Sequence, residues 1–183
     1  FLVMSGMELP LAVMITIPEP WANNHLMSQK KKDFYQYYAT MMEPWDGPAS
    51  IVFSDGDIMG AVLDRNGLRP SRYYITDDDY LILASEVGVL DVDPTKVVTK
   101  DRLRPGKMLL VDTVKGRVID DDELKESYAG KRPYGQWLDE YLVELKDLKI
   151  PNVRVPRYTG DDLHRIQKAF GYSYESVKTV MLP

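Results

Sequence analysis

Near the start of the chain, apolar residues alternate with other residues over a short β-branched stretch. Apolar side chains occupy positions 11, 13, 15 and 17, and Pro18 and Pro20 follow directly. Alternation of this kind is typical of a strand, and prolines are common where a strand stops. We therefore expect a buried β-strand over residues 11–17.

The following segment has the period of an α-helix. Its large apolar side chains fall at positions i, i+3, i+4 and i+7: Phe34, Tyr37, Tyr38 and Met41. Residues at that spacing share one helix face, so the pattern predicts an amphipathic helix over residues 24–43. Asn23 or Asn24 is suited to the N-cap, because an asparagine side chain accepts hydrogen bonds from the first free N–H groups. Pro44 ends the helix.

The middle of the chain has the alternation and the turn residues of antiparallel hairpins. Turns are predicted at Asp55-Gly56, at the acidic residues 77–79 and at Lys115-Gly116, because Gly, Asn and Asp suit turns and disfavour strand interiors. The predicted hairpins pair residues 51–53 with 58–63, 72–76 with 80–84, and 107–111 with 117–120.

Helical patterns return after residue 120. Asp120 to Asp122 offers an N-cap and an acidic first turn, and Gly171 is predicted as the C-cap residue of a later helix. Helices are predicted at residues 120–128, 133–148, 163–170 and 174–182. Pro151 and Pro156 bracket an extended connection, so we expect an α+β body over residues 1–150 and a separate tail over residues 151–183.

Composition excludes several classes of protein. The chain has 183 residues, 44% hydrophobic and 28% charged, as an ordinary globular protein has. Its net charge of −5 gives no general attraction to nucleic acid or anionic lipid. Its longest apolar stretch is far shorter than the roughly 20 residues of a membrane span. We expect no nucleic-acid partner, no membrane segment and a cytoplasmic location.

The chain contains no cysteine, which excludes disulfides, thiolate ligands and a cysteine nucleophile within these residues. His25 and His164 lie far apart in the sequence, and the acidic triplets 77–79 and 120–122 lack the alternating ligand pattern of a calcium loop. The sequence shows neither a glycine-rich phosphate loop nor a Gly-x-Ser-x-Gly element. These residues are therefore predicted to bind no metal and no cofactor.

The sharpest local feature is the string Asp64-Arg65-Asn66-Gly67-Leu68-Arg69-Pro70, between the first two predicted hairpins. Asn66-Gly67 permits a positive φ, and Pro70 forces Arg69 into extended geometry. Asp64 can accept hydrogen bonds from the local backbone or from Arg69. Taken alone, the string is compatible with an ordered turn between strands, or with a site where Arg65 or Arg69 lies beside a bound carboxylate.

Several longer strings resemble the large subunits of glutamate synthases, in the same order. They are Glu43-Pro44-Trp45-Asp46-Gly47-Pro48-Ala49, Leu63 to Tyr74, and Leu83 to Gly88, with supporting matches at Met14 to Trp21, Leu103 to Gly106 and Gln167 to Tyr172. The resemblance covers nearly the whole chain. A shorter motif of Asp, Gly and Pro at the second string is shared more loosely by all class II amidotransferases.

This resemblance implies an α+β fold that is part of the N-terminal-nucleophile (Ntn) hydrolase αββα sandwich, truncated at its N-terminal side. In that family an N-terminal cysteine, with its own α-amino group as base, hydrolyses glutamine. The ammonia travels through a tunnel and combines with 2-oxoglutarate at an FMN site. Electrons from NAD(P)H or ferredoxin arrive through iron–sulfur clusters and reduce the product to glutamate.

The resemblance also implies domains and partners. Residues 1–150 would be the C-terminal part of the type 2 glutamine amidotransferase domain, and residues 151–183 the linker and the start of the central domain. The implied partners are the remainder of the large subunit and a small electron-donating subunit. Loss of the segment before Phe1 would uncover strand edges and apolar faces, so self-association into a homo-oligomer is a further expectation.

No residue of this chain matches a catalytic position of the family. Amide hydrolysis requires an activated nucleophile and an oxyanion hole, and the family supplies both from segments before Phe1. Asn66-Gly67 does not match the family's oxyanion pair, which belongs to a His-Asn-Gly-Glu-type segment. We expect this chain alone to be inactive, and we assign a role in supporting the glutamine pocket to one motif: Asp64, Arg65, Asn66, Gly67, Arg69 and Pro70.

Two other interpretations remain open. The chain could be a non-catalytic amidotransferase-like binding module, although it stops inside an apolar helical pattern at Met181 to Pro183. It could instead be a fragment of another class II amidotransferase, such as an asparagine synthetase. The strings 43–49 and 167–172 disfavour that second alternative.

Overall fold

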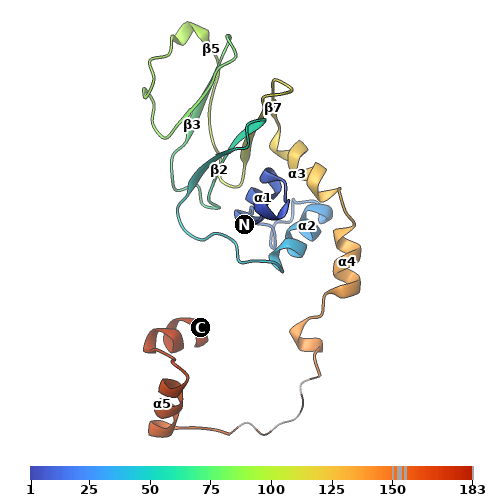
Figure 1. Cartoon of the computed structure of the whole chain (residues 1–183), viewed down its shortest axis with the longest axis vertical. Helices are drawn as coiled ribbons and strands as arrows, with labels where there is room; N and C mark the ends of the chain where they lie inside the picture. The colour runs from blue at the N-terminus through green and yellow to red at the C-terminus, as the bar shows by residue number, and fades with distance from the viewer. Residues whose placement is uncertain (150, 152–153, 155, 183) are drawn as a thin grey trace. The chain divides into compact units, whose positions relative to one another are not determined.

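The computed structural model describes residues 1–149, 151, 154 and 156–182. Over these residues the chain divides into two compact units, Phe1–Leu142 and Val143–Pro183. In the first unit, helices pack on one face of an antiparallel sheet, and strands of a second antiparallel sheet pack on its other face (Figure 1). Its mixture of helices and antiparallel strands is compatible with the expected α+β class.

The first sheet has the strand order β1-β2-β6-β7. Its strands are β1 (Ser50–Ser54), β2 (Ile58–Leu63), β6 (Met108–Asp112) and β7 (Arg117–Ile119). The β1–β2 and β6–β7 pairs confirm the first and third predicted hairpins. Successive side chains of a strand point to opposite faces. Met108 and Leu110 therefore enter the core beneath the helices, while Leu109 packs toward the second sheet.

The second sheet has the strand order β4-β3-β5. Its strands are β3 (Arg72–Thr76), β4 (Leu81–Ala84) and β5 (Val97–Arg102), and the turn η2 (Pro94–Lys96) precedes β5. The β3–β4 pair confirms the second predicted hairpin. Asp79 stands in its turn at a φ of +63°. Strand β5 is not predicted from the sequence pattern, because this strand is mostly exposed and lacks apolar alternation.

Residues 9–16 form a helix, so the strand predicted over residues 11–17 is wrong. Helix α1 (Leu9–Thr16) follows the short turn η1 (Val3–Ser5). Pro10 lies in its first turn, where a proline is tolerated because that N–H has no partner inside the helix. Short runs that are apolar on all sides do not distinguish a helix from a strand. Packing of Met14 and Ile15 against the helical core decides in favour of the helix.

Helix α2 (Gln29–Ala39) is shorter than the predicted span 24–43. Its N-cap is Ser28, whose hydroxyl accepts from the N–H of Lys31 at 3.4 Å, and neither Asn23 nor Asn24 serves as the cap. The predicted apolar face is confirmed for Phe34 and Tyr38, which are buried, whereas Met41 lies beyond the helix and is exposed. The core beneath α2 is largely aromatic: Phe34, Tyr35, Tyr38, Tyr134 and Trp137.

Helix α3 (Asp121–Ala129) confirms the predicted helix and its N-cap. The Asp120 side chain accepts from the N–H groups of Asp122 and Glu123 at 2.9 and 3.2 Å. Helix α4 (Tyr134–Tyr141) stops well before the predicted end at Leu148. Leu142, Leu145 and Leu148 are exposed in this structure. Tertiary packing supplies most of the stability of short helices, and these leucines have too little of it to extend α4.

The second unit contains the turn η3 (Leu145–Asp147), helix α5 (Gly160–Ala169) and the π-type helical segment η4 (Ser176–Met181). Gly171, at a φ of +74°, follows the C-cap of α5, and the N–H of Tyr172 donates to the carbonyl of Gln167 at 2.9 Å. This is the Schellman arrangement favoured by glycine. Most of the expected connection between Pro151 and Pro156 lies outside the described residues. Over the described residues, no helix is long and apolar enough to cross a bilayer.

Candidate functional site: a hollow where the sequence strings meet

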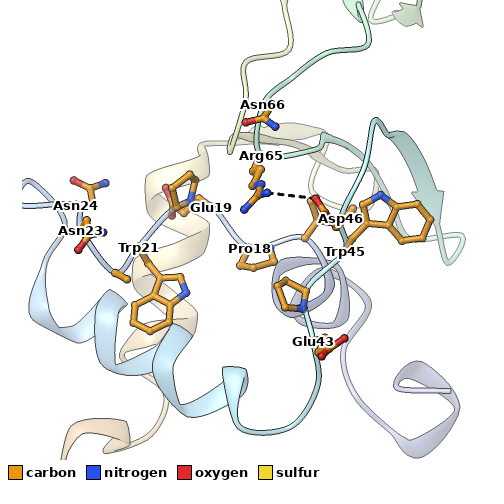
Figure 2. A pocket seen from close by; sticks show the side chains of 14 residues that line it. Pro18, Glu19, Trp21, Asn23, Asn24, Glu43, Trp45, Asp46, Arg65 and Asn66 are labelled. Carbon is orange, nitrogen blue, oxygen red and sulfur yellow. Dashed lines mark hydrogen bonds and ion pairs between the residues drawn. The ribbon is translucent and has the colours of Figure 1, made fainter. Parts of the chain in front are cut away.

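The motif hollow is a concave surface of the first unit with a volume of about 920 Å³. Three loops line it: residues 17–24 after α1, residues 43–46 before β1, and residues 65–66 after β2. These loops are distant in the sequence, and each contains part of a string described above. In Figure 2, Arg65 points toward Asp46, and Trp21 and Trp45 lie on opposite sides of the hollow.

Loop 17–24 forms the first wall and is fixed by its glutamate. Glu19 Oε1 accepts the hydroxyl hydrogen of Tyr35 at 3.0 Å and lies 3.1 Å from the ammonium nitrogen of Lys125. Burial, followed by the negative charge of Glu19, raises the pKa of Tyr35 well above its ordinary value. The hydroxyl of Tyr35 therefore keeps its proton and remains a donor to Glu19 at neutral pH.

The second wall, residues 43–46, is attached through its backbone to the end of α1, directly before the first wall. The N–H of Trp45 donates to the carbonyl of Thr16, the last residue of α1, at 2.7 Å. The indole N–H of Trp45 donates to the carbonyl of Gly47 at 3.2 Å. Gly47 has a φ of +108°, a backbone conformation that favours glycine. These bonds set the direction in which the chain passes from the hollow into β1.

Asp64 fixes the third wall from beneath. The residue is buried, with 3% of its surface exposed. Its carboxylate accepts from the N–H of Ala49 and from the N–H of Asn66, each at 3.0 Å. These bonds, led by that from Ala49, hold the pKa of Asp64 below its ordinary value despite the opposing effect of burial. Asp64 is thus an ionised clamp between the string 43–49 and the string 64–70.

Arg65 reaches from the third wall to the second. Its guanidinium nitrogen lies 3.3 Å from Asp46 Oδ1, but the two side chains are 60% and 86% exposed. Ion pairs this exposed contribute little to stability. Both groups therefore remain accessible at the mouth of the hollow, where each can interact with a charged ligand or with another protein segment.

A turn at residues 103–106 supports the first and third walls from behind. Gly67 has a φ of +61°, and a β-carbon there would overlap the ring of Pro105. A β-carbon on Gly106, which has a φ of +69°, would lie 3.1 Å from the β-carbon of Glu19. Positive φ favours glycine at both positions, and the neighbouring side-chain atoms leave little room for a β-carbon. The string 103–106 therefore packs against the string 64–70 and against loop 17–24.

The structure gathers only part of the predicted motif at the hollow. Arg65 and Asn66 line it, Asp64 and Gly67 lie beneath it, and Arg69 and Pro70 are exposed and do not line it. The carboxylate of Asp64 bonds to backbone N–H groups, the first of the two arrangements considered from sequence. The role of the motif in supporting a glutamine pocket remains a prediction.

Several residues that form the hollow have no role predicted from the sequence. Glu19, Trp21, Trp45 and Asp46 stand inside the strings that carry the resemblance, so the strings were a usable signal for them. Lys125 had no such signal, because it follows a run of acidic residues on a helix and resembles a solvated lysine. Only the folded structure shows its contact with Glu19.

The described lining of the hollow is suited to recognition by charge and hydrogen bonding. It offers carboxylates, a guanidinium group and amide side chains beside two indole rings: Glu19, Glu43, Asp46, Arg65, Asn23, Asn24, Asn66, Trp21 and Trp45. Within that described lining there is no serine, threonine, cysteine, lysine or histidine, so it offers no hydroxyl, thiol, amine or imidazole as a nucleophile or base. The arrangement can hold a ligand or a neighbouring segment in place.

Comparison with known proteins places these features in a family. The family model of class-II glutamine amidotransferases matches residues 1–137. The NADPH-type glutamate synthase large chain of Bacillus subtilis is 50% identical over 183 residues, which are 100% of this chain and 12% of that protein. The NADH-type glutamate synthase of Schizosaccharomyces pombe is 46% identical over 184 residues, covering 96% of this chain and 9% of that protein.

The ferredoxin-dependent glutamate synthase of rice is 45% identical over 183 residues, covering 98% of this chain and 11% of that protein. The chain therefore spans roughly a tenth of the length of the curated relatives it matches. The resemblance to glutamate synthases inferred from the strings is confirmed along the whole chain. With the family model covering η1 through the first half of α4, the chain belongs to the class-II glutamine amidotransferases.

Proposed function

We propose that this chain is scaffold within the glutamine-hydrolysing domain of a glutamate synthase. The observation that carries the proposal is the convergence of strings 14–21, 43–49 and 63–74 on one hollow, together with 50% identity to a glutamate synthase over all 183 residues. Strings that are far apart in sequence but adjacent in space are expected where a fold supports one site.

The proposed activity of the whole protein is transfer of the glutamine amide nitrogen to 2-oxoglutarate, with reduction to give glutamate. The hydrolytic nucleophile is an N-terminal cysteine that these residues do not include. The relatives described above are named for NADPH, NADH or ferredoxin, and we propose a donor of this group. Residues 1–183 offer no thiolate for an iron–sulfur cluster and show no phosphate loop for FMN, so we place both cofactors in other parts of the protein.

We further propose that the first unit is part of an Ntn αββα sandwich. The arrangement of helices on one face of the β1-β2-β6-β7 sheet, with the β4-β3-β5 sheet on the other, supports three of its layers. Residues 1–150 would then belong to the amidotransferase domain, and residues 151–183 to the linker and the start of the central domain. The compact unit Phe1–Leu142 supports a division in this region.

In this proposal the motif at Asp64, Arg65, Asn66, Gly67, Arg69 and Pro70 supports the glutamine pocket and does not carry out chemistry. The clamp between Asp64 and Ala49 and the contact of Gly67 with Pro105 support this role. The proposed partners are the remainder of the large subunit, a small electron-donating subunit and a further copy of the protein. A cytoplasmic location belongs to the same proposal.

The test is release of glutamate from glutamine, measured for the full-length product of the gene and for the 183-residue chain in parallel. We expect turnover by the full-length protein alone. A full-length protein without glutaminase activity would favour the non-catalytic binding module, and the proposal would be wrong. Turnover by the 183-residue chain would show that a nucleophile exists among residues that we consider structural.

A further inference from the structure

Lys125 is a buried lysine whose ammonium group lies among three acceptors from different parts of the chain. Only 5% of its side chain is exposed. The nitrogen lies 2.5 Å from the carbonyl oxygen of Gly106, 3.0 Å from Asp121 Oδ2 and 3.1 Å from Glu19 Oε1. An ammonium group has three N–H donors, and three oxygen atoms lie close to that of Lys125: one as a hydrogen-bond acceptor and two as ion-pair partners.

Other charges complete the cluster. Lys107 Nζ lies 2.9 Å from the same Asp121 Oδ2, and Asp121 Oδ1 accepts the N–H of Met108 at 2.8 Å. Asp121 Oδ2 accepts no hydrogen bond from the described residues, so its contacts with the two ammonium groups are ion pairs at close range. Buried ion pairs of this kind contribute little net stability, because removal of the charges from water offsets their attraction. The cluster is better explained by the geometry that it imposes.

The contacts of Lys125 reach the first and third walls of the motif hollow, the two walls that the turn at residues 103–106 supports. The ammonium group holds Glu19 of the first wall directly. It also holds the carbonyl of Gly106, and the adjacent Pro105 packs against Gly67, next to Asn66 of the third wall. Helix α3, which carries Lys125, is thereby connected to loop 17–24 and, through the turn at 103–106, to residues 65–66.

We propose that Lys125 is the positioning residue of the motif hollow. Its ammonium group sets the separation of loop 17–24 from residues 65–66, without itself lining the hollow or touching a ligand there. This inference rests on the proposed function in one respect: the hollow supports a glutamine site. The positioning itself is a statement about the fold and can be tested without catalysis.

The first experiment measures amide hydrogen exchange in the full-length protein and in its Lys125→Met and Lys31→Met variants. Lys31 is the matched control, because it is a 12% exposed lysine of the same charge cluster that contacts Asp122 and Glu126 and not the hollow. We expect exchange at residues 17–24 and 103–107 to rise about tenfold or more in Lys125→Met and to stay within about twofold of wild type in Lys31→Met.

If Lys125→Met does not fold, a second variant tests the proposal. Glu19→Gln removes the charge of the first wall but leaves Lys125 paired with Asp121, so we expect faster exchange at residues 17–24 and unchanged exchange at residues 103–107. The double variant Glu19→Gln/Lys125→Met lacks the uncompensated carboxylate of Lys125→Met, and we expect it to be better protected than that single variant. Equal exchange in Lys125→Met and Lys31→Met would overturn the proposal.

Kinetics separate this inference from the proposed function. In a glutaminase assay, we expect Lys125→Met to lower kcat/KM for glutamine about tenfold or more, since small displacements of supporting groups are costly, and Lys31→Met to leave it unchanged within about twofold. Wild-type protein without glutaminase activity would refute the proposed function, and the exchange experiment would still decide the role of Lys125. An unchanged kcat/KM in Lys125→Met, beside an active wild type, would refute its link to glutamine.

Discussion

The carboxylate of Asp64 accepts the backbone N–H of Ala49 at 3.0 Å, and the N–H of Asp64 donates to the carbonyl of Ala49 at the same distance. Both residues are buried. The chain leaves the second wall at Ala49 and enters the third at Asp64, so this reciprocal pair closes the base of the hollow. It also makes Asp64 sensitive to substitution.

We expect Asp64→Ala to destabilise the first unit by about 1–3 kcal/mol, because the buried N–H of Ala49 loses its side-chain acceptor. Asp46→Ala is the control, since Asp46 pairs with Arg65 at an exposed position. It should cost no more than about 0.5 kcal/mol. Chemical unfolding of the two variants beside wild type measures both values. Equal midpoints for the two variants would contradict the role given to Asp64.

The pH dependence of stability follows from the same carboxylate. The hydrogen bond from Ala49, and then that from Asn66, lower the folded pKa of Asp64 below its ordinary value of 3.8. A carboxyl group whose pKa is lower in the folded than in the unfolded protein stabilises the folded state at pH values above the unfolded-state pKa. This contribution disappears as the pH falls through the folded-state pKa. The difference in stability between wild type and Asp64→Asn should therefore be constant above about pH 5 and shrink below about pH 4. A difference in stability that grows as the pH falls would show that folding does not lower the pKa of Asp64.

Two glycines with nearly the same φ allow the cost of backbone strain to be measured separately from the cost of steric overlap. Gly67 and Gly116 have φ values of +61° and +64°. A β-carbon on Gly67 would overlap Pro105, whereas a β-carbon on Gly116 would point into open space. We expect Gly116→Ala to cost about 1 kcal/mol from strain alone and Gly67→Ala to cost about 2–4 kcal/mol from strain and overlap together. Urea unfolding of each variant tests this order. Pro105→Ala should reduce the cost of Gly67→Ala.

Arg69, an exposed arginine of the motif that does not line the hollow, tests the pocket-supporting role. In the full-length protein, we expect Arg69→Ala to raise the KM for glutamine about threefold or more while kcat changes little, the pattern of lost binding. Arg132→Ala is the control, because Arg132 is also exposed but lies between α3 and α4. If Arg69→Ala left both folding and glutamine affinity unchanged, the assignment of Arg69 to the motif would have to be abandoned.

The predictable parts of this fold are those that local chemistry specifies. Asp55-Gly56 and Lys115-Gly116 mark their turns in the sequence itself, and the hairpins around them were predicted close to their observed bounds. Asp120 marks the start of α3 in the same way. These signals depend on the backbone preferences of one or two residues, so they need no information about distant partners.

The predictions that failed concern segments whose structure depends on packing against distant parts of the chain. Residues 9–16 are apolar on all sides, and only their burial against α2 makes them a helix. Strand β5 is an edge strand whose exposed side chains give no alternation. Within the site, the string 64–70 was visible because its turn residues are adjacent. The contact of Lys125 with Glu19 joins residues that no local pattern relates.

The turn at 103–106 and Lys125 follow every lining residue of the hollow in the order of synthesis. A ribosome releases loop 17–24 and residues 65–66 before it has made either of the groups that hold them apart. Contacts of such large sequence separation form late, because closing a long loop costs entropy before the contact stabilises it. The hollow therefore forms only after residue 125 has been made, and a chain arrested between residues 70 and 103 would display its walls without their support.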